Sequence, residues 1–400
     1  MSRHIKRIVL GAESGTTYRR LGDVAALVRR EVEVDSDADY IEIGVRSFHK
    51  GTFHRRTLKG AEFTWQGLYQ VKQDDLIFSN IMAWEGAVAQ AKPEDDGCIG
   101  NHRMLTCECD RSIVEPAFLA HYFKTPEGMS KLVGASTGTV ARNRTLTAKA
   151  LANIEVPTPP IEQQQAIVAH LDALAEKIRQ VAEHLDAVER DAEHLLALRF
   201  RDAISGAPMR PMAEIAPAIR RPVEVDISAC YREIGARSFG KGLFAKPDFN
   251  GAEATWQKPV WVKAGDLVLS NIKAWEGAIA IAGEEHGGCI ASHRYITCVP
   301  EPTTATVGFL AYYLLSAEGL EKIGFASPGT ADRNRTLSLT NLGKIEVPTP
   351  PLAIQQSFNR LQAEVAALKA KHAAIRAANA ALLPATLERV FSNSDDVGGS

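Results

Sequence analysis

The nine residues Ser79-Asn80-Ile81-Met82-Ala83-Trp84-Glu85-Gly86-Ala87 return 191 positions later as Ser270-Asn271-Ile272-Lys273-Ala274-Trp275-Glu276-Gly277-Ala278. The same offset holds without a gap from about residue 21 to residue 160, and more than half of the positions between 40 and 107 are identical to their counterparts. The chain therefore contains two copies of one unit, which predicts a molecule with an approximate two-fold axis. Duplex DNA is a well-known target with its own two-fold character.

The bulk composition is that of an ordinary folded protein. Of 400 residues, 45% are hydrophobic and 24% are charged, and this length suits two domains rather than one. No apolar stretch approaches the roughly 20 residues of a membrane helix, and the apolar run near the N-terminus is too short for a signal peptide. Six cysteines do not form a disulfide scaffold, so we expect a cytoplasmic protein without a membrane partner. The net charge of −2 neither supports nor excludes nucleic acid, because basic groups can cluster on one face.

Each copy has a β-rich first part and a long helical second part. Short apolar runs between glycine and proline turns, such as 75–78 and its copy 266–269, predict strands, and residues 116–123 and their copy predict helices. The sequence therefore predicts an α+β fold with two tandem repeated domains, separated by two long helices that form an antiparallel coiled coil with pseudo-two-fold symmetry. The expected limits are 1–158 for the first domain, 159–206 for the first helical spacer, 207–349 for the second domain, 350–392 for the second spacer and 393–400 for a disordered tail.

The helical parts carry heptad patterns. Apolar residues spaced alternately by four and three positions form a first seam: Ile167, Leu171, Leu174, Ile178, Val181, Leu185, Val188, Ala192 and Leu195. Such a repeat is typical of a coiled coil, and Gly206 followed by Pro208 is suited to end the helix. The second seam comprises Phe358, Leu361, Val365, Leu368, His372, Ile375, Asn379 and Leu382. The nearest partner for each seam is the other, and buried polar residues such as His372 usually fix register.

Familiar catalytic signatures are absent from the sequence. It contains no GxxxxGK[ST], no GxGxxG after a strand, no GxSxG and no HExxH, although an active site of an unfamiliar kind is left open. Cys98-x₃-His102-x₄-Cys107 and its copy Cys289-x₃-His293-x₄-Cys298 suggest zinc, but the spacing is not a standard ligand pattern and no fourth ligand is evident. We interpret these residues as small buried cysteines on core strands.

Polar and aromatic residues that suit DNA contacts recur in both copies. Arginine and asparagine can form bidentate hydrogen bonds with guanine and adenine, and arginine, serine and lysine beside glycine suit phosphate contacts. In the first copy the candidate DNA-binding residues are Arg46, Ser47, Lys50, Asn80, Trp84, His102, Arg103, Thr139, Arg142, Asn143 and Arg144. In the second copy they are Arg237, Ser238, Lys241, Asn271, Lys273, Trp275, His293, Arg294, Thr330, Arg333, Asn334 and Arg335.

Alternatives to DNA contact stand beside each of these candidates. Arg46 and its neighbours also fit a solvated hairpin, Trp84 fits a core position, and His102 fits an ordinary surface turn. The loop that contains Arg142 also fits a capped helix start with surface arginines. Met82 in one copy and Lys273 in the other mark a position at which two readers of similar targets would differ.

The chain resembles the specificity subunit of type I restriction–modification enzymes over essentially its whole length. Two motifs carry this resemblance. They are the loop Gly-Thr-x-x-Arg-Asn-Arg-Thr-Leu at 138–146 and 329–337, and the run Ile-Glu-Val-Pro-Thr-Pro-Pro-x-x-x-Gln-Gln that opens each long helix at 154–165 and 345–356. The resemblance implies two target-recognition domains, each reading half of a split DNA site, and a helical spacer on which methyltransferase subunits dock. The glutamines of the second motif are the candidates for partner contact: Gln164, Gln165, Gln355 and Gln356.

The resemblance also implies that chemistry belongs to partners. These would be DNA methyltransferase subunits, two in number, that use S-adenosylmethionine on adenine N6, and restriction and translocase subunits that use ATP and magnesium, so we expect no cofactor in this chain. Because the two domains are near copies on a pseudo-two-fold scaffold, we expect a nearly palindromic target with an unread centre. The alternatives are a chain that itself cuts or methylates DNA, the specificity subunit of a related type II bipartite-site system, and a two-domain adapter that binds protein.

Overall fold

The computed structural model describes residues 16–63, 67–138, 143–253, 258–329 and 335–391. The chain divides into two compact units, and both long helices cross the division. Unit 1 comprises residues 1–184 and 373–400, and unit 2 comprises residues 185–372. The tail expected at 393–400 lies outside the described residues. In the described part of the chain, no helix is long and apolar enough to cross a bilayer.

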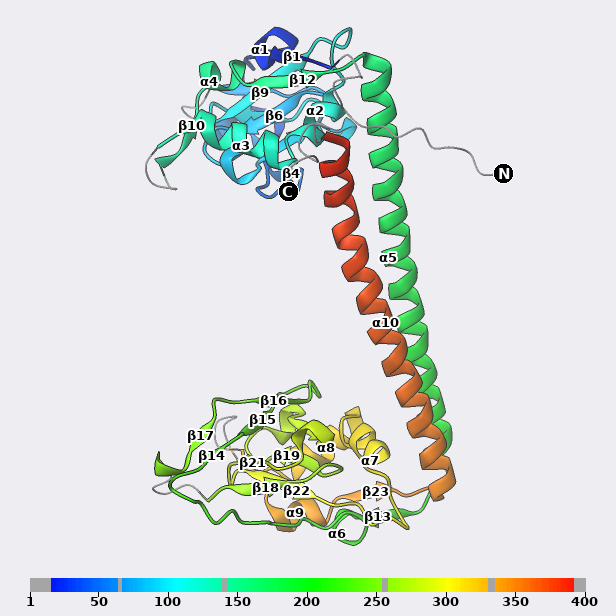
Figure 1. The fold of residues 1–400 in the computed structure, drawn as a ribbon. Helices are drawn as coiled ribbons and strands as arrows, with labels where there is room; N and C mark the ends of the chain where they lie inside the picture. The colour runs from blue at the N-terminus through cyan, green and yellow to red at the C-terminus, as the bar shows by residue number, and fades with distance from the viewer. Residues whose placement is uncertain (1–15, 64–66, 139–142, 254–257, 330–334, 392–400) are drawn as a thin grey trace, which may run out of the picture. The chain divides into compact units, whose positions relative to one another are not determined.

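Unit 1 is built on two small sheets (Figure 1). The first is antiparallel and has the order β2(Ala25–Val28), β9(Met104–Cys109), β6(Leu76–Ser79), β7(Val88–Gln90). The second has the order β4(Thr52–Lys59), β3(Asp39–Val45), β8(Ile99–Asn101), β5(Leu68–Gln70), with β3 and β8 parallel.

Strand β6 is buried on both of its faces, which explains its unbroken apolar sequence. Leu76 and Phe78 belong to one hydrophobic cluster, whereas Ile77 belongs to a second cluster with Ile43 and Cys98. Successive side chains of a strand point to opposite faces, so β6 separates two small cores. Helices pack on the face of Leu76 and Phe78, and the second sheet covers the face of Ile77.

Helices and short strand pairs complete unit 1. The helices are α1(Leu21–Val24), α2(Pro116–Tyr122), α3(Pro126–Ala135) and α4(Ala148–Ala152). The strand pairs are β1(Thr17–Arg20) with β12(Glu155–Thr158), and β10(Ser136–Thr137) with β11(Thr145–Leu146). Helix α3 starts where the sequence predicts a start, because Pro126 occupies its first turn and Thr125 Oγ1 accepts a hydrogen bond from Gly128 N.

Unit 2 repeats most of these elements in the same order, but its described residues contain no strand that corresponds to β2, β10 or β11. Its strands are β13(Met209–Pro211), β14(Cys230–Tyr231), β15(Ile234–Ala236), β16(Leu243–Ala245), β17(Phe249–Asn250), β18(Val260–Val262), β19(Leu267–Ser270), β20(Ile279–Ile281), β21(Cys289–Ala291), β22(Tyr295–Cys298) and β23(Glu346–Pro348). Its shorter helices are α6(Met212–Ile215), α7(Val307–Leu314), α8(Ala317–Phe325) and α9(Leu339–Gly343). The single ladder of β3 and β4 is split here into β15–β16 and β14–β17. Pro247 stands where the first copy has Arg56, and proline cannot donate to the ladder.

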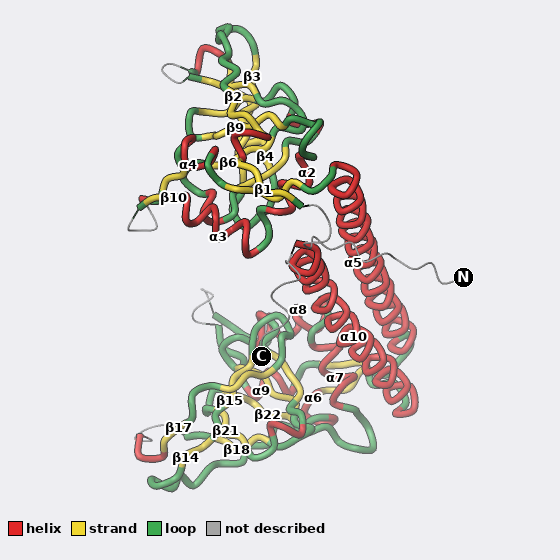
Figure 2. Tube along the Cα trace, turned by 45° about the horizontal axis from the view of Figure 1, so that its top comes forward, coloured by secondary structure: helices red, strands yellow, loops and turns green. Residues whose placement is uncertain are grey.

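The two long helices are α5(Ile161–Ile204) and α10(Leu352–Phe391). Within unit 2 they run antiparallel (Figure 2): Lys369 Nζ lies 2.6 Å from Glu193 Oε1, and His372 Nδ1 lies 2.9 Å from Glu189 Oε1. His372 is buried, as the seam predicts, and Glu189 satisfies its ring nitrogen. The predicted fold class, two α+β repeats with long coiled-coil helices, is confirmed.

The predicted seams are wrong at several positions, both in the middle of the long helices and near their ends. Four seam residues are exposed, with fractions between 39% and 44%: Val181, Leu195, Ile375 and Leu382. Leu196 and Phe200 are buried instead in α5, and Leu387 and Phe391 are buried in α10. A straight helix has 3.6 residues per turn, so a 3.5-residue stripe drifts around it. The C-terminal turns of both helices also pack against a domain, and the residues that are buried there lie four positions apart.

Candidate nucleic-acid interface

One pocket of unit 1 gathers residues from three separate parts of the sequence, and two of these parts contain predicted DNA-binding residues. It has a volume of about 640 Å³ and is lined by Asn80, Ile81, Met82, Trp84, Glu85, His102, Arg103 and Thr145. We call it the reading pocket. The backbone of Asn80 ties its three segments together: Asn80 N donates to Arg103 O at 2.8 Å, and Leu146 N donates to Asn80 O at 2.7 Å. The pairing of β6 with β9 sets this arrangement, because Asn80 follows β6 and Arg103 precedes β9.

Both copies bury an unused hydrogen-bond acceptor at this place. Oδ1 of Asn80 and Oδ1 of Asn271 have no hydrogen-bond partner among the described residues. A buried unsatisfied polar atom costs about 1–3 kcal/mol, yet the feature occurs at equivalent positions in both repeats. An asparagine with a free acceptor can take a hydrogen bond from the N6 amine of adenine while its own amide donates to N7. Because this acceptor is buried in the structure, the amide has to rotate before its oxygen can meet a base edge.

An arginine is held at the rim of the pocket in each copy. Asn101 Oδ1 accepts a hydrogen bond from Arg103 N at 2.9 Å, and Ser292 Oγ accepts one from Arg294 N at 3.3 Å. The Arg103 side chain is exposed, and among the described residues no partner binds its guanidinium. An uncompensated cation on a turn fixed at its backbone can bind a phosphate or the O6 and N7 atoms of guanine.

The tryptophans are half-buried, so they are not core residues. Trp84 lies in the short 3₁₀ turn Ala83–Glu85 and donates its Nε1 hydrogen to Ile81 O at 2.9 Å. The guanidinium carbon of Arg144 lies 5.5 Å from the centroid of the Trp84 ring, and that of Arg335 lies 4.8 Å from the Trp275 ring. Such stacking orients an arginine without using its donors.

The two stacked arginines are not equally available. Arg335 also donates to Gly324 O at 3.0 Å, which commits part of its guanidinium to the fold. Asn143 is exposed. Five other residues of this predicted loop lie outside the described residues: Thr139, Arg142, Thr330, Arg333 and Asn334.

The predicted phosphate-binding loop packs against the same 3₁₀ turn. Ser47 Oγ donates to Glu85 Oε2 at 3.2 Å, and Ser238 Oγ donates to Glu276 Oε2 at 3.0 Å. Arg46, Lys50 and their counterparts Arg237 and Lys241 are exposed. These side chains border the reading pocket's turn and do not line the pocket itself.

Sequence analysis missed two exposed phenylalanines in this loop. Phe48 is 69% exposed and Phe239 is 75% exposed, and both have left-handed backbone, with φ of 60° and 62°. Left-handed backbone is rare for a bulky residue and points to a functional constraint. Their repetition at equivalent positions, each followed by a residue and then Lys-Gly, is the pattern that could have indicated them.

The structure separates the four glutamines predicted to contact partners. Gln164 and Gln355 have no exposed surface. Gln164 accepts from Glu115 N at 2.9 Å and donates to Ile113 O and Pro159 O, and Gln355 makes the equivalent bonds in unit 2. These two side chains attach each helix to its own domain and have no surface to offer a partner, which corrects that prediction. Gln165 and Gln356 are exposed and stay candidates.

The repeated cysteines are buried, as interpreted from the sequence. Cys98, Cys107, Cys289 and Cys298 are free thiols inside the two units. Burial raises the pKa of Cys107 and of Cys298 to about 12, so both thiols are protonated at neutral pH. Within the described part of the chain, no cluster of His, Cys, Asp and Glu has a metal-binding arrangement.

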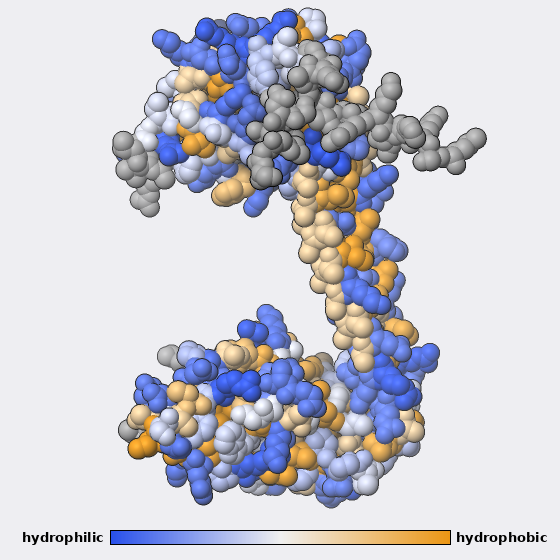
Figure 3. All heavy atoms as spheres, viewed as in Figure 1, coloured by the Kyte–Doolittle hydropathy of each residue, from blue (hydrophilic) through white to orange (hydrophobic). Residues whose placement is uncertain are grey.

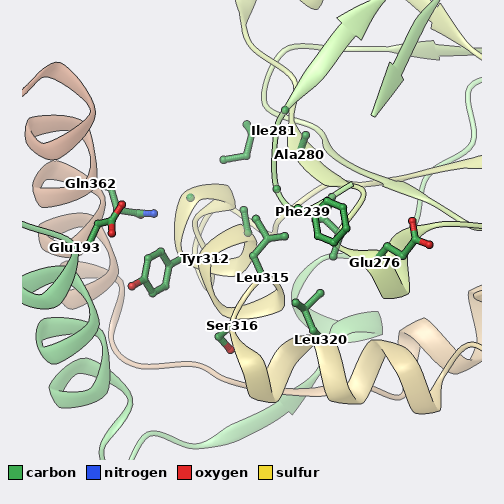
Figure 4. Close-up of a pocket in the computed structure, with 15 residues that line it drawn as sticks. Glu193, Phe239, Glu276, Ala280, Ile281, Tyr312, Leu315, Ser316, Leu320 and Gln362 are labelled. Carbon is green, nitrogen blue, oxygen red and sulfur yellow. The ribbon is translucent and has the colours of Figure 1, made fainter. Parts of the chain in front are cut away.

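A second pocket, of about 900 Å³, occurs in unit 2 (Figure 4). It lies between the domain and the two helices of that unit, and its walls include Phe239, Tyr312, Leu315, Leu320 and Gln362. The counterparts of Gly240, Tyr312 and Leu315 in unit 1 are His49, His121 and Lys124. The two copies therefore differ in polarity at this place.

In unit 1 this substitution creates a buried cluster of basic groups. Burial, followed by repulsion from Lys124, lowers the pKa of His121 to about 4, although Asp172 on α5 lies 3.3 Å from its Nε2 and opposes the shift. The Asp172 side chain is 64% exposed, so solvent screens its charge. Burial lowers the pKa of His49 and of Lys124 as well.

Acid should therefore destabilise unit 1 more than unit 2. Because the folded pKa of His121 lies below the ordinary value of 6.5, the unfolded state binds more protons below pH 6.5. The contribution of His121 to the free energy of unfolding is thus present above pH 6.5 and is lost as the pH falls from 6.5 towards 4. We expect protection of α2 amides from hydrogen exchange, corrected for intrinsic rates, to fall between pH 6.5 and pH 5 more than protection of α7 amides. His121→Tyr, which installs the residue of the second copy, should remove most of the difference, and an unchanged difference would contradict this origin.

Comparisons with known proteins agree with this architecture. Residues 13–190 match the family model of the type I restriction modification DNA specificity domain. The fold is similar to the HsdS subunit from Thermoanaerobacter tengcongensis, with 20% identity, a TM-score of 0.62, and coverage of 98% of this chain and 99% of that chain. It is also similar to a chain from a structure on complex assembly and conformational transition of the type I R-M system, with 20% identity, a TM-score of 0.66, and coverage of 95% and 98%. No curated protein matches the sequence significantly.

Proposed function

We propose that the chain is a DNA-recognition subunit of the type I restriction modification DNA specificity family, whose model matches residues 13–190, and that it reads a bipartite, nearly palindromic DNA site for partner subunits. The first recognition domain would span residues 1–158 and the second 207–349, with helical spacers at 159–206 and 350–392. Partner methyltransferase subunits would modify adenine N6 with S-adenosylmethionine, and restriction subunits would consume ATP with magnesium.

The reading pocket, whose lining residues are repeated in the second copy, is the observation that carries this proposal. All of its lining residues except Met82 are identical in the second copy: Asn80, Ile81, Trp84, Glu85, His102, Arg103 and Thr145. An amide with a free acceptor, an exposed guanidinium and a stacked arginine form a set that matches base edges and phosphates. Two readers with the same side chains, on domains that the sequence repeat predicts to be related by a dyad, should bind similar sequences in inverted orientation.

The surface of α10 suits a partner protein. Exposed alanines follow one another along it between Ala363 and Ala381, and they form a pale stripe in the hydropathy view (Figure 3). Small side chains let another helix approach closely and lose little side-chain entropy on burial. We assign methyltransferase docking to this helical surface, together with Gln165 and Gln356.

Mapping of DNA methylation tests the proposal. We expect co-expression of the chain with its neighbouring methyltransferase gene to produce N6-methyladenine in a split motif whose halves are nearly inverted copies. The motif should vanish when this chain is omitted. A split motif with unrelated halves would keep the recognition function and reject the symmetry. No methylation, with a partner that is otherwise active, would favour a protein-binding adapter.

A further inference from the structure

Around the reading pocket, residues that differ between the two copies lie beside residues that are identical in both. A second hollow of unit 1, of about 240 Å³, shares Ile81, Met82 and Arg103 with the reading pocket. The variable residues of these two hollows are Val45, Arg55, Met82, Asn101 and Met104 in the first copy, and their counterparts are Ala236, Lys246, Lys273, Ser292 and Tyr295. Shared and variable side chains thus form adjoining parts of one surface.

Met82 and Lys273 leave the backbone at the same place and in the same conformation. Each precedes the 3₁₀ turn of its copy, with φ and ψ of −130° and 5° at Met82 and of −135° and 9° at Lys273. The 3₁₀ turns that follow have the identical sequence Ala-Trp-Glu. The two copies therefore present a thioether and an ammonium at equivalent points of one scaffold.

The exchange of Met82 for Lys273 changes the net charge around the neighbouring glutamate. Lys273 Nζ lies 2.6 Å from Glu276 Oε1, and the hydrogen bond from Lys273 is the largest cause that lowers the pKa of Glu276. In the first copy Met82 carries no charge, and Ser47 is the single partner of the Glu85 carboxylate among the described residues. The second copy therefore presents a neutralised pair with two unused ammonium donors, and the first presents an acceptor with a net negative charge.

These two surfaces complement different base edges. Guanine presents the acceptors O6 and N7 in the major groove. Cytosine and adenine present exocyclic amines there, and a carboxylate can accept a hydrogen bond from such an amine. An ammonium group therefore favours guanine over cytosine and adenine. A carboxylate without a cationic partner favours cytosine or adenine over guanine. Met82 is the one lining residue of the reading pocket that differs between the copies, so the base pairs that this pocket reads should otherwise agree.

We propose that Met82 and Lys273 are specificity-determining residues that make the two half-sites differ at one base pair. Lys273 selects guanine, and Glu85 beside Met82 selects a base with an exocyclic amine, adenine or cytosine. The inference rests on the proposed function, since it assumes that the reading pocket contacts DNA.

The test is an exchange of the two residues followed by methylation mapping with the partner methyltransferase. Met82→Lys should shift the first half-site to guanine at that position, with a change in preference on the order of 10- to 100-fold, and should make the halves identical. Lys273→Met should remove the guanine preference of the second half-site alone. Met209→Lys adds the same charge at an exposed methionine of β13 outside both hollows, and it should leave the motif unchanged.

The outcomes separate this inference from the proposed function. If the unmodified chain directs methylation to a split motif and Met82→Lys leaves that motif unchanged, the inference fails and the proposed function stands. It fails as well if guanine already occupies the position in the first half-site, or if both exchanges abolish methylation at every sequence. If the unmodified chain directs no methylation, the proposed function fails and takes this inference with it.

Discussion

Phe200→Ala is expected to destabilise unit 2 by about 3–5 kcal/mol, the usual cost of removing a buried aromatic side chain. Phe200 lies near the end of α5 and is 6% exposed. Its ring centroid lies 4.7 Å from that of Tyr312, 5.1 Å from that of Phe309 and 5.3 Å from that of Phe358. The side chain thus joins the end of one long helix to the domain and to the start of the other helix.

Thiol labelling measures this loss in the unit concerned. Cys298 is 1% exposed and protonated at neutral pH, so its labelling requires opening of unit 2. A loss of 3–5 kcal/mol should accelerate that labelling by about two to three orders of magnitude. Phe325→Ala is the matched control, because Phe325 is 80% exposed in the same unit and its loss should change the rate less than about threefold. Equal rates in the two variants would exclude the proposed role of Phe200.

The double substitution Arg103→Ala and Arg294→Ala should remove most sequence-specific DNA binding. Each arginine that contacts a base bidentately contributes about 1–3 kcal/mol of discrimination, and the two positions belong to separate repeats, so we expect their losses to add. The sum, about 2–6 kcal/mol, corresponds to a loss of affinity of roughly 30-fold or more. Folding should persist, because neither guanidinium binds another described residue and the backbone bond from Asn80 to position 103 remains.

Fluorescence anisotropy with the methylated motif, at several salt concentrations, distinguishes the kind of contact. Base contacts predict relaxed specificity at two positions, whereas phosphate contacts predict a uniform loss and a salt slope flatter by about one for each arginine. As a control, Arg179→Ala removes one positive charge from α5, where Arg179 is 57% exposed and paired with Glu176. A double variant that binds within threefold of the Arg179 control would remove the reading pocket from consideration.

The site could be predicted only in part from the sequence, for reasons visible at particular residues. The offset of 191 identified Asn80, His102 and Arg103 as repeated polar residues but gave no reason to group them. Their grouping depends on the pairing of β6 with β9, which is long-range. Gln164 was predicted to contact a partner because it stands in a family-like motif. Its amide is used inside the unit by three backbone groups from two other segments.

The helical seams could also be predicted only in part from the sequence. The heptad spacing correctly predicted two long helices and a partner for each, because period is a local property of the sequence. It misassigned Leu195, whereas Leu196 and Phe200 are buried, because the end of α5 meets a domain surface as well as a helix.

The sequence by itself determined that there are two copies, what kinds of element they contain, and the chemical character of the residues they share, since repetition and periodicity are read along the chain. Tertiary structure alone decided which of those residues meet. Strand pairing brought Asn80, Trp84 and Arg103 around one pocket with an unused buried acceptor. Domain packing placed Phe200 in a core and left Phe239 exposed, because burial depends on what surrounds a side chain and not on its neighbours in sequence.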